Sequence, residues 1–211
     1  MARLLRTLHG ARSNPSKASI RRLRYLTIDE AKRLIDACDS DFRPLVQAAL
    51  QTGARYGQLA QLIVADFNPD VGTLRLRTRK GDGNEKEYYI TLTDEGSEFF
   101  ELMCAGRTGD ELIFLNNGRE WRKSQQTRPM ADAVERAKIK PLIGFHGLRH
   151  TWASLAVMAG MPLLVVAKNL GHSDTRMVEK HYGHLAPSYV AETTRSSILR
   201  FESYQAALSS L

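Results

Sequence analysis

The hydrophobic spacing of this chain changes from helical to alternating in one segment, TLRLRTRKGDGNEKEYYITLT (residues 73–93). Two leucines and three arginines alternate there: Leu74 and Leu76, with Arg75, Arg77 and Arg79. The turn KGDGN has the glycine and aspartate chemistry of a hairpin and precedes a second strand, expected at 87–92. On both sides of this segment, apolar residues again recur at the spacing of a helix. The sequence therefore predicts a mainly α fold with a small antiparallel β-sheet (α+β), and one strand with a basic face.

Apolar residues at spacings of three and four predict the helices. A capping box of Thr27 and Glu30 marks the first helix start. Its expected apolar face consists of Ile28, Ala31, Leu34, Ile35 and Cys38. A helix is also expected after Gly53, where the helical spacing resumes. The other helices are expected at 43–51, 94–104, 123–138, 146–159, 162–169, 174–181 and 189–208.

The positive charge of the chain is concentrated at its beginning. Of 30 basic and 23 acidic residues, seven basic and no acidic ones lie in residues 1–24, so the rest balance. Such a segment is usually a solvated tail, and less often an arm that lies along a polyanion. At 211 residues the chain can bury one good core. We expect a basic lead-in or linker at 1–24, a catalytic domain at 25–187 and a helical tail at 188–211.

Membrane and secretion signals are missing from the sequence. It contains neither a run of eighteen apolar residues nor the apolar stretch of a signal peptide near its beginning. Cys38 and Cys104 have neither metal-site nor disulfide spacing, which suits a reducing compartment. We therefore expect a cytoplasmic protein.

The stretch GFHGLRHTWASL places three basic or near-basic groups on one helical face. His146, Arg149 and His150 stand at i, i+3 and i+4, which predicts an anionic ligand. The buried stripe of the same helix is expected from Leu148, Trp152, Leu155 and Ala156. Five of six histidines lie between 146 and 184, which raises a metal site as an alternative. The zinc-protease glutamate is missing and Arg149 stands between the histidines, so anion binding ranks higher.

Five short sequence motifs occur along the chain in an order that is typical of one protein family. TGARYGQL carries Arg55, the hairpin turn carries Lys80, HGLR carries His146 and Arg149, LGHSD carries His172, and HYGHL carries Tyr182. This combination resembles the catalytic domain of the tyrosine recombinases, the phage integrase family, over about residues 25–190. The resemblance implies the catalytic-domain fold of that family. It also implies cleavage and rejoining of DNA strands through a covalent 3′-phosphotyrosyl link, with no metal, ATP or other cofactor.

The resemblance also implies roles for individual residues. Arg55 and Arg149 would clamp the scissile phosphate, Tyr182 would be the nucleophile, and Lys80 the general acid, with Lys86 as its competitor. His146 and His172 would flank the phosphate, and His146 would help remove the phenol proton. His150 is interpreted as structural, and His181 and His184 as surface residues or local orienters. The candidate DNA-binding residues are Arg21, Arg22, Arg75, Arg77 and Arg79, although the last three equally suit a solvated strand face.

The chain departs from the family pattern in two places. Gln58 stands where the family usually has glutamate, which puts a supporting interaction of the active site in doubt. The N-terminal helical DNA-binding domain of the family is not expected before Thr27. These departures keep a catalytically weakened DNA-binding module open as an alternative, beside a type IB topoisomerase-like enzyme.

The resemblance finally implies the partners. We expect double-stranded DNA at specific recombination sites, a homotetramer on DNA, a monomer in solution, and a prokaryotic or phage-encoded, nucleoid-associated protein without membrane contact. An apolar stripe in the tail would pack on a neighbouring protomer or on the chain's own body; it comprises Ile198, Phe201, Tyr204, Leu208 and Leu211.

Overall fold

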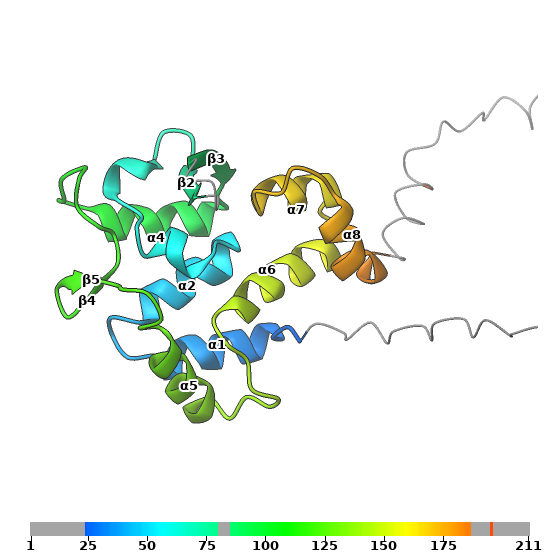
Figure 1. The fold of residues 1–211 in the computed structure, drawn as a ribbon, viewed down its shortest axis with the longest axis horizontal. Helices are drawn as coiled ribbons and strands as arrows, with labels where there is room; N and C mark the ends of the chain where they lie inside the picture. Colours follow the sequence, from blue (N-terminus) through cyan, green and yellow to red (C-terminus); the bar gives the residue numbers. More distant parts are fainter. Residues whose placement is uncertain (1–23, 80–84, 187–194, 196–211) are drawn as a thin grey trace, which may run out of the picture.

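The computed structural model describes residues 24–79, 85–186 and 195 (Figure 1). The helices of these residues are α1 (Ile28–Ala37), α2 (Arg43–Thr52), α3 (Tyr56–Leu59), α4 (Asp94–Cys104), α5 (Thr127–Arg136), α6 (His146–Met158), α7 (Leu163–Asn169) and α8 (Arg176–Tyr182). Short 3₁₀ turns cover Val64–Asp66 and Gly183–Leu185. The strands are β1 (Phe67–Asn68), β2 (Thr73–Arg79), β3 (Glu85–Thr91), β4 (Leu115–Asn116) and β5 (Arg119–Glu120). The mainly α fold with a small antiparallel sheet is confirmed.

Strands β1, β2 and β3 form an antiparallel sheet in that order. Leu74 pairs with Ile90 and Arg77 with Glu87 in the β2–β3 ladder, so the predicted hairpin is present. Among residues 24–79 and 85–186, no helix is long and apolar enough to cross a membrane. Of the helix expected at 189–208, only Arg195 lies among the described residues.

The start of α1 follows the sequence prediction. Thr27 Oγ1 accepts from the Glu30 N–H at 3.2 Å, and Glu30 Oε2 accepts from the Thr27 N–H at 2.9 Å. The predicted apolar face needs one correction, because Ile28 is 60% exposed. Leu34 and Cys38, further along the helix, are buried in the core. The first turn of α1 therefore extends beyond the edge of the core.

Two boundaries differ from the prediction for residues 115–138. The short β4–β5 hairpin was not predicted, although its turn contains Asn117 and Gly118, both with positive φ. Strands of two residues are too short to show alternation. Helix α5 begins at Thr127 rather than 123, because β5 and a turn with Ser124 at φ 66° come first.

Helix α6 runs from beside α1 and α2 towards α7 and α8 (Figure 1) and contributes residues to two hydrophobic clusters. The first cluster extends from Leu26 to Leu148 and holds the core around α1, α2 and the sheet. The second cluster extends from Ala153 to Ala186 and holds the core of α7 and α8. The expected stripe of α6 was wrong in part: Leu148 is buried, but Trp152, Leu155 and Ala156 are only half-buried. Helices α2, α7 and α8 contact α6 and bury it on more than one side, together with Arg149.

A buried carboxylate lies under the basic face of β2. The side chain of Asp66 is fully buried and accepts from the Ile63 N–H at 3.1 Å. Arg75 reaches it at 2.9 Å, and Arg77 at 2.5 Å and 2.9 Å. Arg77 also pairs with Glu87 on β3 at 3.2 Å. Two of the arginines predicted to face solvent or DNA are therefore paired with acids of the sheet and its flanking turn.

We expect Asp66→Asn to lower the free energy of unfolding by about 2 kcal/mol, because hydrogen bonds to a charged group contribute about 1.5–3 kcal/mol each and the amide leaves both arginines poorly paired. Denaturant unfolding of the variant measures this change. Glu87→Gln is the matched control. Its pair with Arg77 is largely exposed, so we expect less than about 1 kcal/mol there. Equal losses in both variants would contradict the role assigned to Asp66.

Candidate active site

The ends of two helices hold the guanidinium of Arg149, which is only 4% exposed. Its Nη1 donates to the carbonyl of Gly53 at 2.9 Å, and its Nη2 donates to the carbonyl of Leu170 at 2.7 Å. These two residues are the C-caps of α2 and α7. The C-terminal end of a helix carries partial negative charge, which stabilises a cation. The buried charge of Arg149 is therefore compensated and fixed in orientation.

Both of these helix ends depend on glycine. Gly53 has φ 67° and Gly171, next to Leu170, has φ 71°, which is the left-handed region that favours glycine. A Cβ on Gly53 would lie 2.8 Å from the Trp152 ring, and one on Gly171 would lie 2.6 Å from Cζ of Tyr88. The backbone consequently approaches both rings too closely for any larger residue.

His172 completes the surroundings of Arg149. Its Nε2 lies 3.1 Å from Arg149 Nη2, and a neutral imidazole can accept that hydrogen bond. Burial, followed by the charges of Arg149 and Arg55, lowers the pKa of His172 and so favours the neutral form. Burial and the charge of Arg55 lower the pKa of Arg149 to about 10, so the guanidinium remains charged at neutral pH. These contacts use three of its five N–H donors, and the side chain of Tyr88 also forms a hydrogen bond with the guanidinium.

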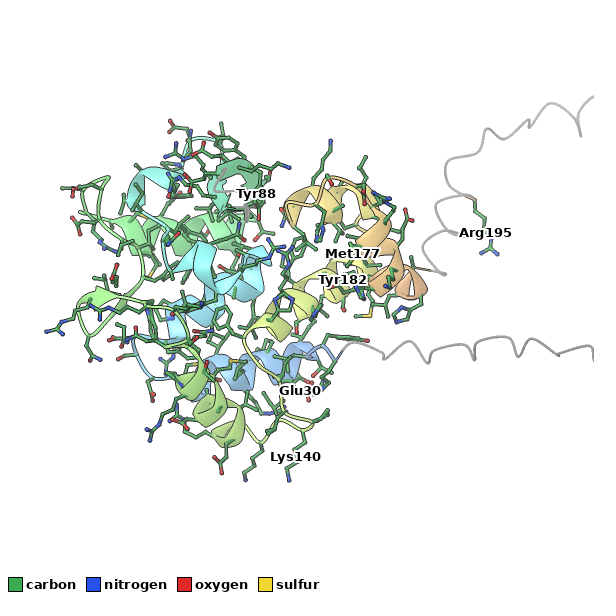
Figure 2. All side chains as sticks on the ribbon, viewed as in Figure 1. Glu30, Tyr88, Lys140, Met177, Tyr182 and Arg195 are labelled. Carbon is green, nitrogen blue, oxygen red and sulfur yellow. The ribbon has the colours of Figure 1, made fainter. Side chains whose placement is uncertain are left out.

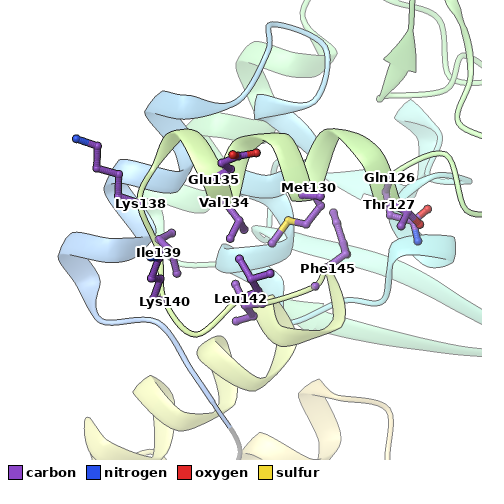
Figure 3. Close-up of a pocket in the computed structure, with 13 residues that line it drawn as sticks. Gln126, Thr127, Met130, Val134, Glu135, Lys138, Ile139, Lys140, Leu142 and Phe145 are labelled. Atoms are coloured by element: carbon purple, nitrogen blue, oxygen red, sulfur yellow. The ribbon is translucent and has the colours of Figure 1, made fainter.

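A pocket of about 210 Å³ lies beside Arg149. It is lined by Ala54, Arg55, Tyr56, Gly57, Gln126, Phe145, His146 and Arg149. The cationic side chains come from the start of α3 and the first turn of α6. A second, larger cavity of about 940 Å³ lies along α5 and residues 138–145 (Figure 3). Its lining is mainly apolar and contains Glu135 beside Lys138 and Lys140, whereas the smaller pocket contains Arg55 and Arg149 and no acid, so we assign anion binding to the smaller pocket.

Gln58 connects Arg55 to the sheet. Its side chain is buried, and Oε1 accepts from the backbone N–H of Arg55 at 3.0 Å. Its Nε2 donates to the carbonyl of Arg77 at 3.1 Å and to Oγ1 of Thr78 at 3.0 Å, and lies 3.1 Å from Oη of Tyr88. A carboxylate could not donate to that carbonyl. The residue that departs from the family pattern thus fixes α3 to β2 and β3.

Tyr182, the last residue of α8, is buried and packs in the second hydrophobic cluster (Figure 2). Its phenol oxygen lies 2.6 Å from Nδ1 of His150 on α6. Burial raises the pKa of Tyr182 to about 12, and the charge of Arg149 opposes this shift. Burial and the charges of His146, His181 and Arg149 lower the pKa of His150 to about 4. At neutral pH both the phenol and the imidazole are therefore uncharged.

The histidine beside Tyr182 is not the one that the sequence suggested. The sequence predicts a structural role for His150 and help in removing the phenol proton from His146. In the structure His150 makes the contact, whereas the His146 ring lies edge-on to the His150 ring at a centroid distance of 4.8 Å. The spacing of α6 places both histidines on one face, and only the packing of α8 decides between them. His181 lies beside the Tyr182 ring at 6.2 Å, and His184 is exposed.

The remaining candidates are positioned as follows. Lys80, Arg21 and Arg22 lie outside the described residues. Arg79 is the last residue of β2. Lys86, the competitor of Lys80, is an exposed residue of β3. Of the catalytic candidates among the described residues, Arg55, His146 and Arg149 line one pocket, His172 contacts Arg149, and Tyr182 contacts His150.

Comparison with known proteins gives a consistent result. The model of the phage integrase family matches residues 24–188. The integrase of Salmonella phage P22 is 29% identical over 184 residues, which cover 83% of this chain and 47% of the relative. The XerA recombinase structure is 27% identical with a TM-score of 0.64, covering 84% of this chain and 66% of that one.

The catalytic domain of bacteriophage HP1 integrase is a further structural relative. It is 26% identical with a TM-score of 0.62, and the match covers 87% of this chain and 97% of that domain. By contrast, this chain spans about half the length of the curated relatives it matches, such as 47% of the P22 integrase.

Proposed function

Because this chain belongs to the phage integrase family, we propose that it breaks and rejoins DNA strands in site-specific recombination through a covalent link to Tyr182. The main support for this proposal is the position of Arg149. The buried guanidinium of Arg149, held by two helix ends, borders a pocket that also contains Arg55 and His146. Two guanidiniums at one pocket, of which that of Arg149 is fixed, can stabilise the negative charge that develops on a phosphodiester under attack.

The proposed reaction assigns one task to each group. The phenol oxygen of Tyr182 attacks the phosphorus, and the bond to the 5′ oxygen breaks. Arg55 and Arg149 bind the nonbridging oxygens, with His146 and His172 beside the phosphate. Lys80 protonates the leaving 5′ oxygen. The resulting 3′-phosphotyrosyl ester preserves the bond, so a 5′ hydroxyl of another strand can reseal it without ATP.

The proposed partner is double-stranded DNA at specific recombination sites. The matching relatives are named integrases and tyrosine recombinases, which does not favour a topoisomerase. We propose a homotetramer on DNA, a monomer in solution and a cytoplasmic, nucleoid-associated location. Since Asp66 pairs with Arg75 and Arg77, the proposed phosphate contacts of the lead-in (Arg21, Arg22) should contribute more to affinity than those of β2.

Covalent trapping tests the proposal most directly. A nicked duplex that loses a short fragment after cleavage should leave this protein attached to DNA in denaturing gels. Recombination between two paired sites then separates a recombinase from a topoisomerase, which relaxes supercoils at single sites. A chain that binds such duplexes but never becomes attached would instead be a DNA-binding module.

Chelators are expected to leave adduct formation unchanged, within about twofold of the untreated rate. The guanidiniums supply the positive charge that divalent ions supply in other phosphoryl-transfer sites. Cleavage in excess EDTA, with and without added Mg²⁺ or Zn²⁺, measures this. Loss of cleavage on chelation and its recovery with zinc would support the histidine-cluster alternative.

Deleting residues 1–23 is expected to flatten the salt dependence of DNA binding. The deletion removes six positive charges but keeps Arg24, which pairs with Glu30. Each phosphate contact contributes about 0.9 to the slope of log affinity against log salt, so the slope should fall by up to about 5. Binding titrations across a salt series measure the slopes. A full-length variant with the six charges replaced by glutamine is the control, and an unchanged slope in both would identify a passive linker.

A further inference from the structure

We infer that His150, one helical turn beyond His146, is the catalytic base that accepts the proton of Tyr182 when the phenol attacks phosphate. The inference rests on the proposed function and deepens it, because it assigns the nucleophile's proton to a specific atom, Nδ1 of His150.

The inference is based on the packing of α8 against α6. Oη of Tyr182 and Nδ1 of His150 are 2.6 Å apart, although the residues stand 32 positions apart in the chain. The Tyr182 side chain is only 5% exposed, with Ala153, Val157 and Val178 in its cluster. A buried phenol loses its proton to a group within hydrogen-bond reach rather than directly to bulk water. Nδ1 of His150 is within that reach.

Burial favours the uncharged forms of both His150 and Tyr182. Burial, followed by the charges of His146, His181 and Arg149, disfavours a charged imidazole at His150, and burial disfavours a charged phenolate at Tyr182. Both partners are therefore neutral before DNA binds. We assign the phenol as the donor and Nδ1 as the acceptor, the direction that a base needs, so the one N–H of the neutral imidazole belongs on Nε2. His150 is thus in the protonation state that a general base requires.

His150 can hold the Tyr182 proton between cleavage and rejoining. The Tyr182 oxygen forms a bond to phosphorus while its proton moves to Nδ1 of His150, and the phosphorus–O5′ bond breaks. The imidazolium carries one positive charge next to a phosphate whose negative charge increases in the transition state. When a 5′ hydroxyl attacks the phosphotyrosyl ester, its proton returns to the group that protonated the 5′ oxygen in cleavage, and His150 returns the other proton to the Tyr182 oxygen as the phosphorus–tyrosine bond breaks. One group therefore acts as base in cleavage and as acid in rejoining.

His146 has a different position. It lines the pocket with Arg55 and Arg149, and its contact with the pair is the edge-on packing against the His150 ring. We assign His146 to the phosphate and His150 to the nucleophile. The two histidines of α6 stand four residues apart. They therefore act at the two ends of the bond that forms, His150 at the phenol oxygen and His146 at the phosphate.

Two variants and a more acidic phenol test the assignment. His150→Asn keeps an acceptor near the position of Nδ1 but cannot take up a proton, so we expect cleavage of the nicked duplex to be about 10²–10⁴-fold slower, with DNA binding retained. Replacing Tyr182 by difluorotyrosine lowers the phenol pKa and should remove most of the His150→Asn defect. His146→Asn is the matched control, and its defect should not respond to the acidic phenol. Cleavage by His150→Asn within twofold of wild type, or a defect that difluorotyrosine does not relieve, would overturn the inference.

A measurement on the protein without DNA tests the role of His150 separately from cleavage activity. Nitrogen-15 NMR of labelled histidine in the intact chain should show His150 as the Nε2–H tautomer, with an acceptor shift at Nδ1 that changes in Tyr182→Phe. An Nδ1–H tautomer would overturn the inference even if the enzyme cleaves DNA. The expected tautomer without any covalent adduct from the wild-type chain would overturn the proposed function, and the catalytic role of His150 with it.

Discussion

Replacing Tyr182 by phenylalanine is expected to abolish the covalent adduct with DNA and to leave DNA binding nearly unchanged. The substitution removes the only atom of this side chain that can form the ester, while the ring keeps its packing in the second cluster. The substitution should lower the free energy of unfolding by about 1 kcal/mol, because it removes the hydrogen bond between Tyr182 and His150 and one such bond usually contributes that much. Denaturing gels of the trapped complex and a binding titration measure the two effects.

Tyr89→Phe is the matched control for this prediction. Tyr89 is 65% exposed on β3, so removal of its hydroxyl should affect neither adduct formation nor stability. Persistent covalent attachment of the Tyr182→Phe protein would mean that another side chain is the nucleophile, and the site would have to be assigned again.

Arg149→Ala is expected to slow cleavage by about 10²–10³-fold, a loss of about 3–4 kcal/mol of transition-state stabilisation. The substitution also leaves the carbonyls of Gly53 and Leu170 without their donor, so the protein should be less stable. Single-turnover cleavage and denaturant unfolding, measured on the same samples, separate the two losses.

Arg149→Lys distinguishes charge from geometry at this site. An ammonium group keeps the charge but lacks the planar fork that can donate to two carbonyls and a phosphate together. We expect at least tenfold slower cleavage than in the wild type, with better DNA binding than in Arg149→Ala. Unchanged cleavage in both variants would make Arg149 a structural residue only.

Local patterns in the sequence predicted much of the fold. The capping box of Thr27 and Glu30 and the bounds of α4 depend on residues three or four apart, and both agree with the structure. The β2–β3 hairpin depends on alternation and a short turn, and it agrees as well. Residues 146 and 149 share a helical face, so their position in one pocket also follows from spacing. These features are set within one element or one turn.

The remaining features depend on contacts between distant segments. Asp66 binds Arg75 and Arg77 because a 3₁₀ turn packs beside β2, and the helix ends that hold Arg149 come from residues 53 and 170. Likewise, only the packing of α8 selects His150 over His146 as the neighbour of Tyr182. Sequence spacing contains no information on these distances. Spacing along the chain therefore identifies candidate site residues but not the contacts that orient them.

The position of Arg149 couples anion binding to tertiary structure. One of its carbonyl partners ends α2, which belongs to the first hydrophobic cluster, and the other ends α7, which belongs to the second. A phosphate bound to this guanidinium therefore favours the state in which the two clusters are docked. By thermodynamic linkage, docking must raise the affinity for phosphate by the same factor. The unit that carries the tyrosine is consequently held most firmly against the rest of the molecule when a DNA backbone occupies the site.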